Sequence, residues 1–436
     1  MKDISKKYLL LLIAFLCVFR LLYGLASEFW FDDELQIYLI GLKSFTTETW
    51  PYYGPDVVYT QTQIPGALQG ILVSLPLYIL PIPEAPSLFL GLLSIIILGY
   101  LAHYISKRFS DIPKWAIWIL TFTTPWMMHF STRVVNPSYV LIFSIPFFLC
   151  FIEAMDYYKN ALIKKGLAFF VIGFSICCIM QIHLSWVLLF PFAVLAFLYT
   201  LKNDRKKFLQ YLLYFLLGAA IGISTLIPTL VHPDSSGAGK VASNIVFKAD
   251  NILNAPAILT KYLSFAAFEI NYMMGANTKE RLEIVYHHWW MAPFTAYLYI
   301  LGFAQVALFV ITFFIKNDDD SWKKIKWTLL GSYLLLFISF FFSIKSPSSH
   351  AFIILFPIPF IYSFYCYRWL FSKHKIWSKF FAIALFSGII FHIAMGLESY
   401  HTKSLYLNRE KAQQAIEQKD YKILGIRRAD KLGYGY

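Results

Sequence analysis

The sequence predicts an all-α protein that crosses a membrane about eleven times. Hydrophobic residues make up 58% of the 436-residue chain and charged residues only 14%, whereas about 25% of a soluble domain is charged. Apolar runs of spanning length, about 20 residues each, recur from end to end. The connections between these runs alternate between base-rich and base-poor, as in polytopic membrane proteins. The formal charge of +13 therefore reflects topology rather than nucleic-acid binding.

The first apolar run extends from about Tyr8 to Ala26 and follows Lys2, Lys6 and Lys7. We interpret it as a retained first span, because no small-residue cleavage pattern follows it. The later runs of spanning length start near residues 87, 114, 135, 166, 184, 207, 291, 326, 349 and 379. The five cysteines all lie inside apolar runs, away from the polar loops in which a disulfide or zinc site would be built.

The loop charges give the orientation. If the N-terminus is cytoplasmic, every connection on the cytoplasmic side is rich in Lys and Arg. These bases are Lys107, Arg108 and Lys114; Lys159, Lys164 and Lys165; Lys202, Arg205, Lys206 and Lys207; Lys316, Lys323, Lys324 and Lys326; and Arg368, Lys373, Lys375 and Lys379. The short outer connections carry few bases. We therefore expect a cytoplasmic N-terminus, an outer C-terminus and, from the size and composition, a bacterial cytoplasmic (inner) membrane.

Residues 61–80 are apolar enough to resemble a further span, which would reverse the side of every later loop. Five prolines in and just after this stretch, from Pro65 to Pro86, favour a broken segment. We assign residues 61–80 to an interfacial or partly buried helix within a first outer loop, residues 27–86. A second outer loop, residues 231–290, opens with turn-forming residues and then has the pattern of short surface helices. The membrane domain then covers residues 1–396, and residues 397–436 form a small, partly helical exterior tail.

Three consecutive acids, Asp32, Asp33 and Glu34, follow the first span directly. The chain has only 25 acidic residues, so such a cluster beside a membrane is a candidate for proton transfer or cation binding. The alternative is a solvated helix start, because acids are favoured in the first turn of a helix.

Other costly polar groups also fall at the predicted outer ends of spans, so we expect one outward-facing polar cavity. They are Arg133 with Asn136, Gln181 with His183, the stretch from Glu280 to His288, and the stretch from Lys345 to His350. Each has a simpler interpretation. Arg133 could extend to lipid headgroups, and His183 could be a hydrogen-bonded turn residue. His287 and His288, together with Glu283, have a spacing that is compatible with a metal site. The sequence offers no third firm ligand beside them.

Several of these segments resemble the membrane-embedded GT-C glycosyltransferases, in particular the protein O-mannosyltransferase and aminoarabinose-transferase group. The similar segments are Asp33-Glu34 after the first span, Gln63 to Leu68 in the first loop, Arg133 to Pro137, Tyr286 to Phe294, and Lys345 to Pro347 followed by Phe356 to Pro359. The chain departs from the family at Ile64 and His183, where members often carry a base, and at Asn136, where members carry Asp.

The resemblance implies transfer of a sugar, with inversion, from a polyprenyl-phosphate donor to a lipid, protein or glycan acceptor on the outer face. Asp33 is then the expected general base, with Glu34 and Asp32 in support. Arg133, Lys345 and His183 are the expected donor-phosphate ligands. Gln63, Asn136, His287 and His288 are the expected cavity residues.

A divalent metal cation remains open as a cofactor, with Asp33, Glu34 and His288 as its ligands. Two other functions also remain open. An oligosaccharide polymerase or ligase would share the polyprenyl-linked donor but has less need of an acid pair after the first span. A transporter or lipid flippase would place polar groups near the middle of the membrane instead of at the outer ends of the spans.

Overall fold

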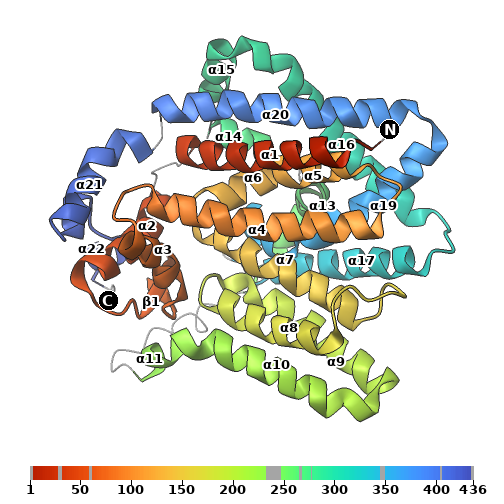
Figure 1. Ribbon diagram of the computed structural model, residues 1–436, viewed down its shortest axis with the longest axis horizontal. Helices are drawn as coiled ribbons and strands as arrows, with labels where there is room; N and C mark the ends of the chain where they lie inside the picture. The colour runs from red at the N-terminus through yellow and green to blue at the C-terminus, as the bar shows by residue number, and fades with distance from the viewer. Residues whose placement is uncertain are drawn as a thin grey trace.

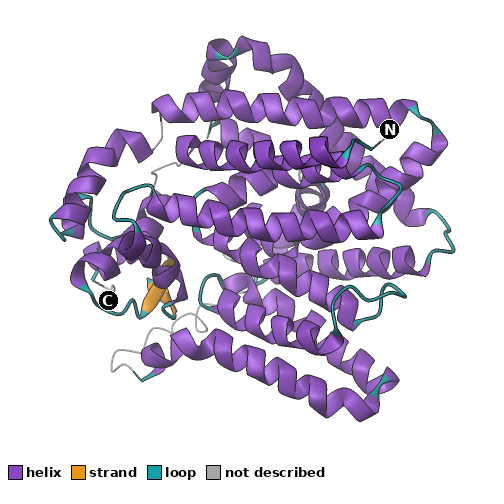
Figure 2. Cartoon of the chain, in the orientation of Figure 1, coloured by secondary structure: helices purple, strands orange, loops and turns teal. Residues whose placement is uncertain are grey.

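Helices dominate the structure, because a backbone that crosses lipid must satisfy its own hydrogen bonds. The computed structural model describes residues 3–27, 32–57, 61–231, 247–264, 268–275, 277–343, 349–402 and 405–433. Most of the long helices run side by side in one bundle, and a small hairpin lies at one end of it (Figures 1 and 2). The all-α prediction is therefore correct apart from that hairpin.

The first half of the chain contains the hairpin and the helices around it. Its elements are α1 (Lys6–Ser27), α2 (Asp32–Thr47), β1 (Tyr53–Val57), β2 (Thr62–Pro65), α3 (Leu68–Ile79), α4 (Ala85–Arg108), α5 (Lys114–Thr123), α6 (Pro125–Thr132), α7 (Asn136–Ala154), α8 (Lys165–Met180), α9 (Phe190–Asn203), α10 (Phe208–Ile223) and α11 (Ile227–Leu230). A 3₁₀-helix, Leu184–Leu189, leads into α9.

The second half contains short helices in the second predicted loop, four longer helices, and a C-terminal segment. Its helices are α13 (Ala255–Leu263), α14 (Phe268–Met274), α15 (Thr278–His287), α16 (Ala292–Phe314), α17 (Asp320–Phe340), α18 (Ser349–Phe352), α19 (Pro357–Lys373), α20 (Ile376–Thr402), α21 (Arg409–Glu417) and α22 (Arg428–Lys431). Helix α20 continues to Thr402, past the boundary predicted at residue 397.

Seven helical stretches among the described residues are long and apolar enough to cross a membrane. They are Lys6–Ser27, Ala85–Arg108, Asn136–Ala154, Leu184–Asn203, Arg205–Leu230, Trp289–Phe314 and Ile376–Thr402. The remaining predicted spans coincide with α5 and α6, with α8, with α17, and with α18 and α19. These helices are shorter, broken or begin with a charged turn. The chain is therefore a multi-pass membrane protein by the length and composition of its helices.

Helix α7 is the centre of the bundle. In the apolar stretch of α7 that could cross the membrane, 94% of the residues are buried, whereas 22% are buried in the corresponding stretch of α1. A helix that is apolar on every side is stable only when other helices surround it. Side chains of α4, α5, α8 and α19 share one hydrophobic core with α7. This packing fixes the start of α7, and with it the loop that carries Arg133.

Residues 61–80 do not form one helix, and the prediction is wrong for the first part of this stretch. Residues Thr62–Pro65 form strand β2, which pairs antiparallel with β1, and α3 begins only at Leu68. Gly66 separates the two elements with φ +116°, and a Cβ there would lie 2.5 Å from the Gln181 side chain. Helix α3 has 12 residues, about 18 Å in length, which is too short to cross a core of about 30 Å.

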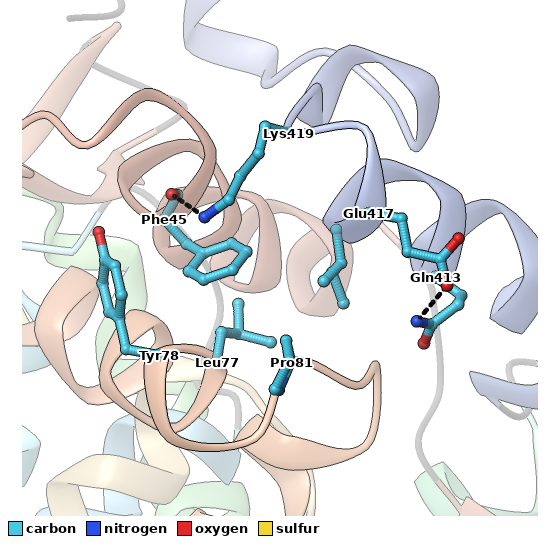
Figure 3. A pocket seen from close by; sticks show the side chains of 8 residues that line it. Phe45, Leu77, Tyr78, Pro81, Gln413, Glu417 and Lys419 are labelled. Atoms are coloured by element: carbon cyan, nitrogen blue, oxygen red, sulfur yellow. Dashed lines mark hydrogen bonds between the residues drawn. The ribbon is translucent and has the colours of Figure 1, made fainter.

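The C-terminal segment, residues 405–433, lies at the same end of the bundle as α2, α3 and the hairpin (Figure 1). Leu39 and Leu42 of α2 form a small core with Ala415 and Ile416 of α21. Beside this core is a groove of about 550 Å³. Figure 3 shows Lys419 reaching across the groove to the backbone oxygen of Phe45, 3.5 Å away. The predicted exterior tail is therefore packed against the first loop.

Candidate functional site

The three acids occupy the first turn of α2, which begins at Asp32. Glu34 is buried, and its carboxylate forms an ion pair with the guanidinium of Arg133. Both side chains are less than 8% exposed. Asp33, the residue before Glu34, has a side chain that is 76% exposed and lies 3.5 Å from Arg428 Nη2. The side chain of Asp32 is not among those described. Neighbouring acids thus have opposite environments.

Arg133 lies in the short break between α6 and α7. Its other terminal nitrogen lies 2.9 Å from Nε2 of His129, one turn earlier in α6. Pro137, in the first turn of α7, fixes the start of that helix because its φ is already helical. The guanidinium therefore bridges Glu34 and His129. A donor phosphate at Arg133 would have to share this cation with Glu34.

The predicted cavity residue Asn136 lies close to the turn after α8, and Gln63 lies on β2 of the hairpin. Asn136 donates a long hydrogen bond of 3.5 Å to the Ile182 oxygen. Gln181 donates to the Gly222 oxygen at 2.8 Å and accepts a hydrogen bond from Thr225. The backbone of Ala67, just after β2, donates to the Thr225 oxygen at 3.2 Å. The first loop, the start of α7 and the ends of α8 and α10 therefore meet.

His183 is a turn residue within this region. Its Nδ1 accepts a hydrogen bond from the backbone of Ser185 at 3.1 Å, so it caps the 3₁₀-helix that follows. This contact agrees with the interpretation of His183 as a turn residue. Binding of a donor phosphate by His183 stays a prediction. Lys345, the other predicted phosphate ligand, lies outside the described residues.

Comparison of the chain with protein-family models, curated proteins and solved structures found no match.

His287 and His288 lie beside a different acid. Their ring nitrogens are 3.5 Å and 3.1 Å from the carboxylate of Glu398, near the end of α20. His288 thus contacts Glu398, and Glu34 contacts Arg133. The metal set of Asp33, Glu34 and His288 stays a prediction. Within the described ranges, no group of three or more His, Cys, Asp or Glu side chains has the arrangement of a metal site.

Sequence reasoning missed two buried polar residues behind the site. Arg20 in α1 donates hydrogen bonds to the Phe122 and Met127 oxygens, and His392 in α20 lies 2.9 Å from the Thr123 oxygen. The break between α5 and α6 frees the carbonyl groups of Phe122 and Thr123, and neighbouring side chains satisfy them. An Arg in the middle of an apolar run was the available signal. These contacts hold α6, and hence Arg133, in place.

Sequence reasoning also missed the role of the C-terminal segment. Arg427 forms a buried ion pair of 3.1 Å with Asp56 of β1, with both side chains at most 4% exposed. Gln63, which is opposite Asp56 in the hairpin, donates to the same carboxylate at 3.2 Å. Arg428 reaches Asp33, and its backbone donates to Gln36 of α2. The segment therefore contacts both the hairpin and the helix that carries the acids.

Proposed function

We propose that this protein is a membrane glycosyltransferase that moves a sugar, with inversion, from a polyprenyl-phosphate donor to an acceptor on the outer face of the membrane. The observation that carries the proposal is the pair of neighbouring acids at the start of α2. One acid is buried against Arg133, and the other is exposed where the polar loops converge. This arrangement supports a base and a fixed cation at one end of the bundle.

Asp33 acts as the general base. An acceptor hydroxyl is a weak nucleophile until a positioned base removes its proton, an effect of about 10²- to 10⁴-fold. The exposed carboxylate of Asp33 can reach an acceptor from the aqueous side. Glu34 has a positioning role, because its carboxylate is already neutralised by Arg133.

Cations stabilise the phosphate that leaves. Negative charge develops on this group where water is scarce, so a nearby fixed cation contributes strongly. Arg133 is shared with Glu34, so only part of its positive charge acts on the phosphate. Lys345 and His183 are proposed to supply further hydrogen bonds to the phosphate. The lipid chain of the donor enters from the bilayer between helices, which explains why the enzyme is embedded.

The proposed topology has eleven spans, a cytoplasmic N-terminus and an outer C-terminus in a bacterial cytoplasmic membrane. The seven long apolar stretches are counted together with α5–α6, α8, α17 and α18–α19. With this count, the acids, the hairpin and residues 405–433 all face outward, on the side where polyprenyl-linked sugars are used.

Asp33→Asn tests the proposal. We expect the envelope glycan that depends on this protein to fall by about 10²-fold or more, because the base is lost. Expression and membrane insertion should stay unchanged, because Asp33 is exposed. The measurement is the glycan profile of cell-envelope fractions from cells without the gene, complemented with either form. Asp318→Asn, an exposed acid before α17, is the matched control. A normal profile with Asp33→Asn would contradict the mechanism.

A further inference from the structure

A second, smaller cavity of about 220 Å³ lies between α2, the loop before β1 and the C-terminal segment. It is smaller than the roughly 300–1,000 Å³ of sites for drug-sized ligands, so it suits a single ring. Its lining combines aromatic, hydroxyl and cationic side chains, including Trp50, Tyr52, Ser44, Thr49, Lys43 and Arg427. Trp50 is 39% exposed as a residue, which leaves part of it open to a ligand.

The charges around this cavity balance. Lys43 is paired with Asp430 at 3.4 Å, and Arg427 with Asp56 at 3.1 Å. Two cations and two carboxylates give no net charge. An anionic ligand such as a phosphate would compete with the two carboxylates, whereas a neutral ligand rich in hydroxyl groups would keep both pairs intact.

Polar atoms of these ion pairs still have hydrogen-bonding capacity. Among the residues that the structure describes, the buried atoms without a hydrogen-bond partner include Arg427 Nε, Asp56 Oδ2 and Asp430 Oδ2. Buried polar atoms are normally hydrogen-bonded, and each exception requires an explanation. Of these residues, Arg427 lines the cavity and Asp56 is its ion-pair partner. A ligand whose groups both donate and accept, as hydroxyl groups do, matches this end of the cavity.

We propose that this cavity binds one neutral sugar ring of the acceptor. The ring would stack its apolar face on Trp50, as flat apolar faces do on aromatic side chains. Its hydroxyl groups would bond to the side chains around Arg427 and Lys43. The inference that the ring belongs to an acceptor rests on the proposed function.

The position of the cavity limits the acceptor further. Lys43 is ten residues beyond Asp33 on α2, about 15 Å along the helix. The ring in the cavity is therefore not the one whose hydroxyl faces the base. In this proposal, the acceptor is a sugar chain that extends from the base to the cavity.

Ligand-observed saturation-transfer NMR on the full chain in nanodiscs tests the site without any donor. The neutral probes are glucose, galactose, mannose, N-acetylglucosamine and maltotriose, and the anionic probes are glucuronate and glucose 6-phosphate. We expect a neutral probe to bind more tightly than either anionic probe. Trp50→Ala should weaken binding roughly tenfold, and Trp50→Phe should weaken it less, since an aromatic face remains. Trp289→Ala, an exposed tryptophan elsewhere, should leave binding unchanged.

Three results would overturn the inference: no neutral probe binds, an anionic probe binds better, or Trp50→Ala binds as the wild type does. The two proposals fail separately. If Asp33→Asn leaves the glycan profile normal while neutral sugars still bind at Trp50, the proposed mechanism is refuted and the proposed sugar site is supported. If Asp33→Asn abolishes the glycan but no neutral sugar binds, only this site is lost.

Discussion

At the scale of single residues, Asp33 and Glu34 show how a helix separates two chemically similar neighbours. Successive side chains on an α-helix point about 100° apart. Once α2 packs on the bundle through Ile37 and Ile40, Asp33 faces outward and Glu34 faces inward. The inward acid requires a partner because an isolated buried charge is very costly. Arg133 is that partner.

Stability measurements should separate the two acids. Glu34→Gln leaves Arg133 buried without its counter-ion, so we expect a loss of about 3–5 kcal/mol in the free energy of unfolding. Asp33→Asn removes only an exposed pair with Arg428, worth about 1 kcal/mol or less. The measurement is thermal unfolding in detergent. Glu34→Gln combined with Arg133→Met should recover part of the loss. Equal stability of Glu34→Gln and wild type would refute the ion-pair assignment.

At the scale of elements, the C-terminal segment is the main departure from the sequence prediction. Ala412, Ala415 and Ile416 of α21 are all buried, and their spacing is that of a helix with one apolar face. This pattern was visible in the sequence, but its target was not. The segment packs on α2 and pairs Arg427 with Asp56 of the hairpin.

Arg427→Ala should release the C-terminal segment. The change leaves Asp56 buried without its cation, which costs about 3–5 kcal/mol. We therefore expect chymotrypsin to cut within residues 405–433 at least roughly tenfold faster, because local opening exposes the backbone. Arg409→Ala is the matched control, since Arg409 is 41% exposed and pairs with Glu84 at 2.6 Å. Similar cleavage rates for both variants would argue against Arg427 as the anchor.

At the scale of the whole molecule, the candidate site residues Asp33, Glu34 and Arg133 lie at one end of the helix bundle. Helix α1 begins at the opposite end from α2, the hairpin, α21 and α22 (Figure 1). Arg133, in the break between α6 and α7, contacts α2, and Gln181, in the turn after α8, contacts the hairpin. An enzyme that works on one face of a membrane requires such a one-sided distribution.

Cysteine labelling tests the topology. In a cysteine-free background, Gln418→Cys should react with a membrane-impermeant maleimide in intact spheroplasts. Asp318→Cys, in the base-rich connection before α17, should react only after permeabilisation. Both residues are exposed, so burial does not interfere. Labelling of both from the outside would show that a span has been miscounted.

The sequence by itself determined the membrane character, the helical segments and the short, non-spanning α3, because hydrophobicity, run length and proline act locally. Every predicted span starts close to a helix, with the largest difference at α17, which begins at Asp320. Only the tertiary structure decided which acid is buried, what Arg133 binds and where the C-terminal segment packs. Glu34 and Arg133 are 99 residues apart, and Asp56 and Arg427 are 371 apart. No local pattern encodes such pairs, because packing of the whole bundle brings their side chains together.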